Sequence, residues 1–239
     1  MSASSRAIIL KAIKYGETSL IIHAYTKEYG KLAFIVKGAR KAKAKIQANI
    51  IQPLSIVELD FKHSIRKDLH FLNEARVTHI FHSIPSDMAK TAMAMYLLEI
   101  VNKSIQSEME NEALFSFIHD FLIALDVHQA YKNWHYFFLL ECSKYFGFYP
   151  NNNYSQEKCY FDPNLGIFSS LEEVGYKVDD QLSLILSKLL FESLETIDSI
   201  EISKVQRQQL LKELERFYAI HVPNFGEIKS LEVYRQVFS

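Results

Sequence analysis

The sequence predicts an α+β protein in which a small five-stranded β-barrel precedes an α-helical part. In the first part of the chain hydrophobic residues alternate with polar ones, and after Pro85 they recur with the period of an amphipathic helix. Five short strands in succession are typical of a small closed barrel. Hydrophobic residues make up 49% of the 239 residues, which is ample for a packed core. We therefore expect two domains, residues 1–80 and residues 81–239.

The strands are expected near residues 6–13, 19–25, 31–37, 54–61 and 68–77. They are separated by the Tyr15-Gly16 and Tyr29-Gly30 turns and by a long basic segment after Gly38. Side chains two positions apart in a strand lie on the same face of a sheet. The alternation predicts these residues on one face: Leu20, Ile22, Ala24, Leu32, Phe34, Val36, Val57, Leu59, Phe61, Leu69, Phe71, Ala75 and Val77.

The remainder of the chain is predicted to be helical. Hydrophobic stripes from Met93 to Val101 and from Leu114 to Leu125 indicate two core-facing helices, the first beginning near Pro85. Further helices are expected near residues 131–147, 180–196 and 203–221. The segment YFDPNLGIF resembles a hairpin, so we expect a hairpin-like insertion near residues 150–175.

The charges are unevenly distributed along the chain. The whole chain has a formal net charge of -1, but residues 1–80 carry 14 Lys and Arg against 6 Asp and Glu. The first domain is therefore basic by +8 and the rest is acidic by -9. A basic domain is suited to an anionic partner such as nucleic acid.

The motifs of common enzymes are absent from the sequence. There is no G-x-S-x-G nucleophile motif, no phosphate-binding loop ending in Gly-Lys-Ser or Gly-Lys-Thr, no H-E-x-x-H and no Cys-x-x-Cys. We therefore expect no enzymatic activity, no catalytic residue and no cofactor.

Isolated groups of polar residues are weaker candidates for a site. His128, His135 and Cys142 recur every seven residues, which would place neighbours about 10.5 Å apart on one helix, too far to share a metal. His79 and His82 lack further ligands, so we expect no metal site. The carboxylate pairs Glu172-Glu173 and Asp179-Asp180 are expected at the surface, and Cys142 and Cys159 as free thiols.

Two basic clusters in the first domain are the strongest functional signal. The segment KGARKAKAK carries five cations in nine residues, and a second cluster lies in the turn between the fourth and fifth strands. Cations on one surface attract a phosphate backbone. The predicted nucleic-acid-binding residues are Lys37, Arg40, Lys41, Lys43, Lys45, Lys62, Arg66 and Lys67. Candidates for stacking on bases are Tyr15, Tyr25, Tyr29 and Phe61.

The order and spacing of several short motifs resemble one bacterial family. These are the Tyr15-Gly16-Glu17 turn, Thr26 before Tyr29-Gly30, the K-G-A-R-K block at Lys37, and Gln52-Pro53 before a strand. This pattern resembles the N-terminal domain of the RecO family of bacterial DNA repair proteins. FFLLECSKYFGFYP resembles the Leu-rich helix of that family, which ends in Gly-x-x-Pro.

The resemblance implies an N-terminal oligonucleotide-binding (OB-fold) β-barrel, an α-helical C-terminal domain and a non-enzymatic role in recombinational DNA repair. RecO-like proteins bind single- and double-stranded DNA, anneal complementary strands and act with RecR. The two together help to load RecA on strands coated by single-stranded DNA-binding protein (SSB). In several members the acidic C-terminal tail of SSB binds RecO. Lys132 with Trp134 and Arg207 with Leu211 are candidates for that contact.

One departure from the family concerns zinc. Many relatives carry two Cys-x-x-Cys pairs after the Gly-x-x-Pro helix, whereas this chain has only Cys159 there. We expect the structural zinc to be missing and the hairpin to be held by Tyr160, Phe161, Ile167 and Phe168 instead.

Two alternative functions remain open. A barrel-plus-helix adaptor would bind an acidic protein partner and no DNA, and an RNA-binding OB protein would prefer RNA. We expect a cytoplasmic protein without membrane contact, because the chain has neither a long apolar run nor a secretory signal.

Overall fold

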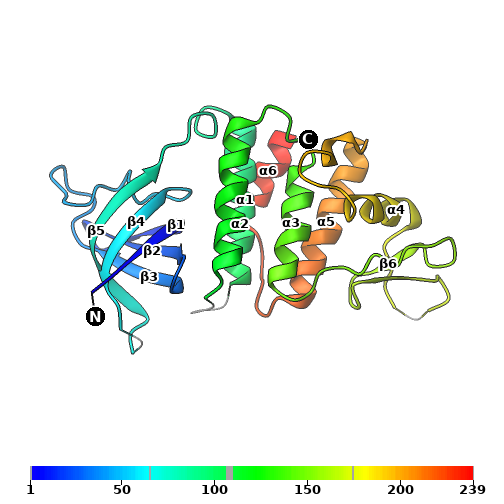
Figure 1. The fold of residues 1–239 in the computed structure, drawn as a ribbon, viewed down its shortest axis with the longest axis horizontal. Helices are drawn as coiled ribbons and strands as arrows, with labels where there is room; N and C mark the ends of the chain where they lie inside the picture. Colours follow the sequence, from blue (N-terminus) through cyan, green and yellow to red (C-terminus); the bar gives the residue numbers. More distant parts are fainter. Residues whose placement is uncertain (1, 65, 106–109, 174, 239) are drawn as a thin grey trace. The chain divides into compact units, whose positions relative to one another are not determined.

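The computed structural model describes residues 2–64, 66–105, 110–173 and 175–238. The chain divides into two compact units, Met1–Val127 and His128–Ser239 (Figure 1). The change from strands to helices falls between His79 and Met88. The first unit extends to Val127, so it contains the first two helices as well as the barrel. The expected domain boundary near residue 80 stays a prediction.

The first unit begins with a closed five-stranded barrel, as predicted. Its strands are β1 (Ser2–Tyr15), β2 (Ser19–Thr26), β3 (Gly30–Val36), β4 (Ile56–Lys62) and β5 (Leu69–His79). Their order around the barrel is β1-β2-β3-β5-β4, and β4 closes the ring by pairing with β1. Only the β3–β5 pair is parallel among these neighbours. The barrel, its strand count and the helices that follow confirm the predicted OB-fold class.

The barrel core contains most of the residues that the alternation predicted. Three consecutive inward positions of β2 and three of β3 are buried, as are three of β4. The buried residues predicted from sequence are Leu20, Ile22, Ala24, Leu32, Phe34, Val36, Val57, Leu59, Phe61 and Ala75. Burial of such side chains stabilises the fold by about 1.5–3 kcal/mol each.

The predicted facing of β5 is wrong at both ends of the strand. Leu69, Phe71 and Val77 are exposed, whereas His70 is buried. The register of β4 and β5 explains part of the error. Leu72 pairs with Phe61 and Glu74 pairs with Asp60, so Asn73 between them has no partner in β4. This bulge reverses the alternation. His70 and Leu72 face inward before it, and Ala75 faces inward after it.

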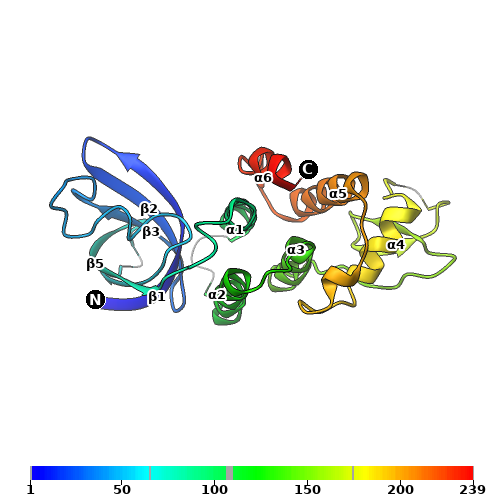
Figure 2. The same cartoon turned by 90° about the horizontal axis from the view of Figure 1, so that it is seen from above.

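Two helices complete the first unit, α1 (Met88–Ser104) and α2 (Glu112–Val127), which lie side by side in Figure 2. Asp87 begins α1, since its side chain accepts hydrogen bonds from the amides of Ala89 and Lys90. Near the end of α2, the Asp126 carboxylate accepts hydrogen bonds from three consecutive amides, those of His82, Ser83 and Ile84. This carboxylate fixes the connection from the barrel to α1.

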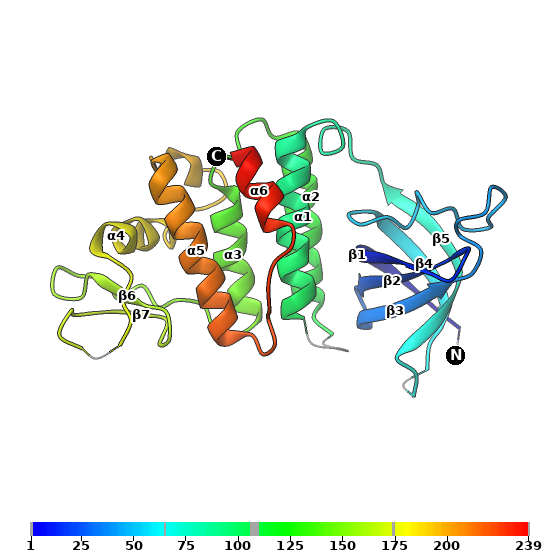
Figure 3. The ribbon, with the colours of Figure 1, turned by 180° about the vertical axis from the view of Figure 1, so that it is seen from behind.

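The second unit contains four helices in its described part: α3 (Trp134–Tyr145), α4 (Asp180–Leu189), α5 (Lys204–His221) and α6 (Leu231–Phe238). A short 3-10 helix, η1, spans Ile197–Ser199. Helices α3 and α5 lie side by side (Figure 3). Two hydrogen bonds join these helices. The Tyr136 hydroxyl donates to the Arg207 carbonyl, and the Tyr218 hydroxyl donates to the Leu139 carbonyl. 

Two helix predictions for this unit need correction. The helix expected over 180–196 ends at Leu189. Ser193 and Thr196 instead form a turn, in which the Thr196 hydroxyl accepts from the Ser193 amide. Serine and threonine side chains compete in this way with helical hydrogen bonds. The C-terminal helix α6 was not predicted, because its eight residues give too short a hydrophobic pattern.

The predicted hairpin is present between α3 and α4. It consists of β6 (Tyr160–Asp162) and β7 (Ile167–Ser169), paired antiparallel. Phe161 and Phe168 are buried, and both contact aromatic neighbours in this unit. Tyr160 and Ile167 are half-buried. Aromatic packing therefore contributes to the hairpin.

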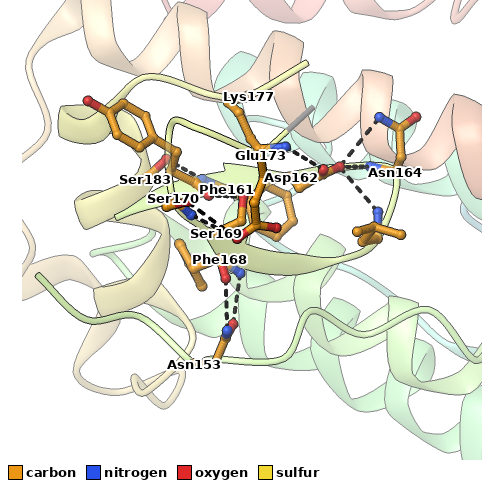
Figure 4. A network of polar contacts seen from close by, with 12 residues as sticks. Asn153, Phe161, Asp162, Asn164, Phe168, Ser169, Ser170, Glu173, Lys177 and Ser183 are labelled. Carbon is orange, nitrogen blue, oxygen red and sulfur yellow. Dashed lines mark hydrogen bonds and ion pairs between the residues drawn. The ribbon is translucent and has the colours of Figure 1, made fainter. Parts of the chain in front are cut away.

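Polar contacts also hold the hairpin (Figure 4). Asn153 bonds both backbone groups of Phe168, at 2.7 and 2.8 Å. Asp162 accepts hydrogen bonds from the backbone amides of Asn164 and Leu165 at the turn, and from the ammonium group of Lys177 at 2.8 Å. Side chains and backbone thus join the hairpin to the segments on either side of it.

Candidate nucleic-acid interface

The first basic cluster lies in the loop that follows β3. Ala39 and Ile46 are buried in the barrel core, so they anchor the basic segment between them. The backbone amide of Arg40 donates to the Thr18 carbonyl, and its guanidinium donates to the Glu17 carbonyl. The loop is thereby fixed on the β1–β2 turn. Its five cations are all exposed: Lys37, Arg40, Lys41, Lys43 and Lys45.

The second basic cluster lies where the sequence places it, between the end of β4 and the start of β5. Lys62 is the last residue of β4, and Arg66 and Lys67 precede Leu69 at the start of β5. All three cations are exposed. In OB folds the loop between the fourth and fifth strands is a common ligand-binding loop.

None of these eight cations forms an ion pair with a carboxylate in the described part of the chain. By contrast, Lys27 and Arg76 of the same barrel contact the carboxylates of Glu112 and Asp60. The two clusters therefore present uncompensated positive charge to solvent. Such charge attracts polyanions and raises their rate of encounter.

A third basic group, on the outer faces of β1, β2 and β3, was not predicted. Lys11 pairs with His23 across β1 and β2. Burial lowers the pKa of His23, and the neighbouring cations Lys31 and Lys11 lower it further. Burial, followed by the charge of Lys11, also lowers the pKa of Lys31. Only the strand register brings these residues together, so sequence spacing could not reveal the group.

This third group borders a hollow of about 330 Å³. The hollow also contains Lys67, which connects it with the second basic cluster. The ammonium of Lys31 donates to the Asn102 and Ile105 carbonyls near the end of α1. The hollow is lined by His23, Lys31, Leu32, Ala33, Lys67, Asp68 and His70.

Two of the four candidate stacking residues are unsuitable. Tyr25 and Phe61 are fully buried, so no base can reach their rings. Tyr29 is half-buried and packs edge-on against Phe61. Tyr15 is 52% exposed and remains available.

Phe71 is an exposed aromatic residue that the sequence interpretation placed in the core. Phe71 is 49% exposed, and the Lys37 ammonium lies 5.0 Å from its ring centroid. A cation over a ring face is attracted by the electrons of the ring. The exposure of Phe71 could not be predicted from the alternation, because the bulge in β5 reverses it between Phe71 and Ala75.

The second unit holds a separate candidate site for an acidic ligand. Of the two pairs predicted from sequence, Arg207 and Leu211 line one pocket together. Trp134 is buried and does not line it, and Lys132, although exposed, does not line it either. The full lining is His135, Tyr136, Arg207, Gln208, Leu211, Tyr234, Arg235 and Phe238. Two arginines beside an apolar floor suit a carboxylate attached to an apolar residue.

The weaker candidate groups are not assembled into a catalytic or metal site. His128 precedes α3 and is exposed, whereas His135 and Cys142 are buried within that helix, so the three do not share one helical face. Burial raises the pKa of the Cys142 thiol. The described residues contain no group of three or more potential metal ligands. Both cysteines are free thiols, and the paired carboxylates at 172–173 and 179–180 are exposed, as predicted.

Comparisons with known proteins agree with this architecture. The family described as recombination protein O, N terminal, matches residues 1–81. Its C-terminal counterpart matches residues 85–232. The chain belongs to the RecO family. The barrel is thus the N-terminal domain of this family, and the predicted family resemblance is confirmed.

Curated relatives extend the similarity over the whole chain. DNA repair protein RecO of Flavobacterium psychrophilum is 34% identical over 240 residues and covers 100% of both chains. Its counterpart in Flavobacterium johnsoniae is also 34% identical, over 245 residues and 100% of both. RecO of Phocaeicola vulgatus is 30% identical over 234 residues, 97% of each chain. Within the described residues, no helix is long and apolar enough to cross a membrane.

Proposed function

We propose that this RecO-family chain is a DNA-binding recombination mediator in recombinational DNA repair. In this role it anneals complementary strands and, with RecR, promotes RecA loading on SSB-coated single-stranded DNA. It works in the cytoplasm through binding alone, without catalytic residues or a cofactor. The family membership and the names of its relatives as DNA repair proteins support this role.

The observation that carries the proposal is the set of eight exposed cations on the barrel, none of which has an ion-pair partner among the described residues. A folded domain gains little stability from such a concentration of like charge, because the charges repel one another. A phosphate backbone supplies the missing anions and releases its own counterions on binding. Backbone contacts carry little sequence information, so the binding is of low sequence specificity.

Annealing follows from the same electrostatics. Two complementary strands repel each other through their phosphates. A surface that holds cations in two clusters, Lys37–Lys45 and Lys62–Lys67, can neutralise part of both strands at once. Reduced repulsion raises the rate at which the strands meet.

The pocket between α3, α5 and α6 supports a proposed contact with the acidic tail of SSB. Although the second unit is acidic overall, Arg207 and Arg235 place two positive charges at one apolar pocket. The Arg207 guanidinium already donates to the Lys132 carbonyl and the Asn133 side chain. The Arg235 side chain is 41% exposed, and its guanidinium lies 3.4 Å from the Glu215 carboxylate, so an acidic ligand would replace Glu215 as its partner.

The test is the anisotropy of a labelled DNA single strand across a salt series. If the loop cations contact five phosphates, the slope of log affinity against log salt should be about -3.5, at about -0.7 per phosphate. Lys41→Glu with Lys43→Glu should weaken binding to all sequences. Lys158→Glu with Lys188→Glu, which changes exposed lysines of the second unit, is the matched control.

Three outcomes would contradict the proposal. No binding at low salt would favour an adaptor that recognises an acidic protein. Stronger binding to a matched RNA strand would favour an RNA-binding OB protein. Equal losses from the loop variant and from the control would place the DNA contact outside the loop.

A further inference from the structure

An apolar row crosses the outer face of the barrel. The register pairs Ile13 with Ile21, Ile21 with Ile35, and Ile35 with Phe71. Ile13 and Phe71, at the two ends, are 40% and 49% exposed, and the two isoleucines between them are half-buried. With strands about 4.8 Å apart, the row extends about 14 Å across β1, β2, β3 and β5.

Cations border this row on both sides. On one side, the Lys37 ammonium lies over the Phe71 ring. On the other side, a neighbouring row crosses the same strands. Lys11 pairs with His23, His23 pairs with Ala33, and Ala33 pairs with the exposed Leu69. None of the described residues in these two rows is acidic. An apolar strip with a lysine on each side is complementary to a polymer with flat apolar groups on a charged backbone.

We propose that Phe71 is a stacking platform for unpaired bases, and that it makes the barrel prefer single-stranded over double-stranded DNA. This inference rests on the proposed function, because it assumes that the barrel binds DNA. A base offers its flat face to an aromatic ring only when it is unstacked. In a duplex both faces of each base are covered, so a duplex contacts the cations alone.

The position of Phe71 supports this role over a structural one. Its ring lies outside the barrel core, in which the buried phenylalanines of the barrel are Phe34 and Phe61. It also lies within reach of Lys37, the first cation of the basic loop. A strand whose phosphates contact the loop therefore brings its bases to the row. Ile13 and Leu69 extend the apolar contact on either side.

The experiment compares three labelled ligands of equal length on the full chain: a DNA single strand, a strand of abasic sites, and a duplex. Phe71→Ala removes the ring and leaves every loop cation in place. Stacking on one base contributes about 1–3 kcal/mol, so single-strand affinity should fall about fivefold or more. Affinity for the abasic strand and the duplex should change less than twofold. Phe191→Ala, which removes an 81% exposed ring at the end of α4, should leave all three unchanged.

The outcomes separate this inference from the proposed function. If Phe71→Ala weakens the binding of all three ligands equally, the ring acts by positioning Lys37, and the proposal that it stacks on bases is wrong. If Phe71→Ala changes nothing while Lys41→Glu with Lys43→Glu abolishes binding, the platform is wrong and the proposed function stands. If the wild-type chain binds none of the ligands, both are wrong. A 2-aminopurine base whose fluorescence is quenched by the wild type and less by Phe71→Ala would support stacking directly.

Discussion

The Lys177 ammonium lies 2.8 Å from the Asp162 carboxylate, in a pair whose side chains are only 6% and 5% exposed. Burial raises the pKa of Asp162, but the hydrogen bonds from Lys177 and from the amides of Asn164 and Leu165 outweigh it, so the pKa is lowered overall. Asp162 is the last residue of β6, so the pair joins the hairpin to the segment that precedes α4. This ion pair and aromatic packing hold the hairpin.

Substitution of Asp162 should therefore destabilise the second unit. Asp162→Asn leaves the buried ammonium of Lys177 without its counterion, a change that costs about 3 kcal/mol or more. The free energy of unfolding, measured by urea denaturation, should fall by this amount. Glu173→Gln, which alters an exposed carboxylate near the same hairpin, should have an effect below about 0.5 kcal/mol.

The pH dependence of this pair follows from the lowered pKa of Asp162. A carboxyl group with a lowered pKa in the folded state stabilises the fold above its ordinary pKa of about 3.9. The difference between the wild type and Asp162→Asn should persist from pH 7 to about pH 4.5 and shrink only at lower pH. A difference that vanished already near pH 6 would show that the carboxylate is not held by Lys177.

Substitution of Asp126 should loosen the connection between the barrel and α1. Burial raises the pKa of Asp126, but the hydrogen bonds from the amides of His82, Ile84 and Ser83 prevail and lower it. Asp126→Ala removes the acceptor of three amides and should cost about 1–3 kcal/mol, the cost of leaving the buried Ile84 amide without an acceptor. Hydrogen exchange of these three amides would report the loss. Asp120→Ala, an exposed position of the same helix, should leave their protection unchanged.

His135 should make the second unit sensitive to mild acid. Burial and the charge of Arg207 hold the pKa of His135 well below its ordinary value. The folded chain therefore keeps this ring neutral, whereas the unfolded chain takes up a proton below about pH 6.5. The fold should lose up to about 1.4 kcal/mol per pH unit as the pH falls below that value.

The variant His135→Phe isolates this effect, because it has no proton to bind. Denaturation at pH 7 and at pH 5.5 should show a smaller loss of stability for His135→Phe than for the wild type. His128→Gln, which changes an exposed histidine, should behave as the wild type does. An equal loss in all three proteins would assign the acid sensitivity to other groups.

The arginine pocket predicts a specific defect in tail binding. Arg235→Glu should lower the affinity for a peptide bearing the acidic SSB tail about tenfold or more, because a charged hydrogen bond contributes about 1.5–3 kcal/mol. Binding can be followed by anisotropy of a labelled peptide at low salt. The control is Lys212→Glu, which changes an exposed charge on α5. The affinity of this variant for the peptide should fall far less. An unchanged affinity for Arg235→Glu would place the tail elsewhere.

Much of the barrel could be predicted because buried residues alternate with more exposed ones in β3 and in most of β2 and β4. Leu20, Phe34 and Leu59 are examples of inward residues whose position in the core follows from period two alone. The basic loop could be predicted for a different reason. Lysine side chains are almost never buried, and Lys41 and Lys43 are indeed exposed.

The rest of the site depends on contacts between distant segments. Phe71 was assigned to the wrong face because a bulge in β5 changes the parity of the strand, and a bulge has no clear signature in the sequence. Lys11, His23 and Lys31 come together only through the pairing of three strands. Sequence alone likewise could not show that Arg235 of α6 joins Arg207 and Leu211 in one pocket.

The closure of the barrel by the β1–β4 pairing has a consequence for how this interface can change over time. With every barrel strand paired on both sides, a ligand is held by side chains and loops rather than by added strands. A substitution at Lys43 or Arg66 therefore leaves the backbone ladder intact. Lineages can gain or lose cations in these loops, and so change the DNA affinity that we propose for them, at little risk to folding.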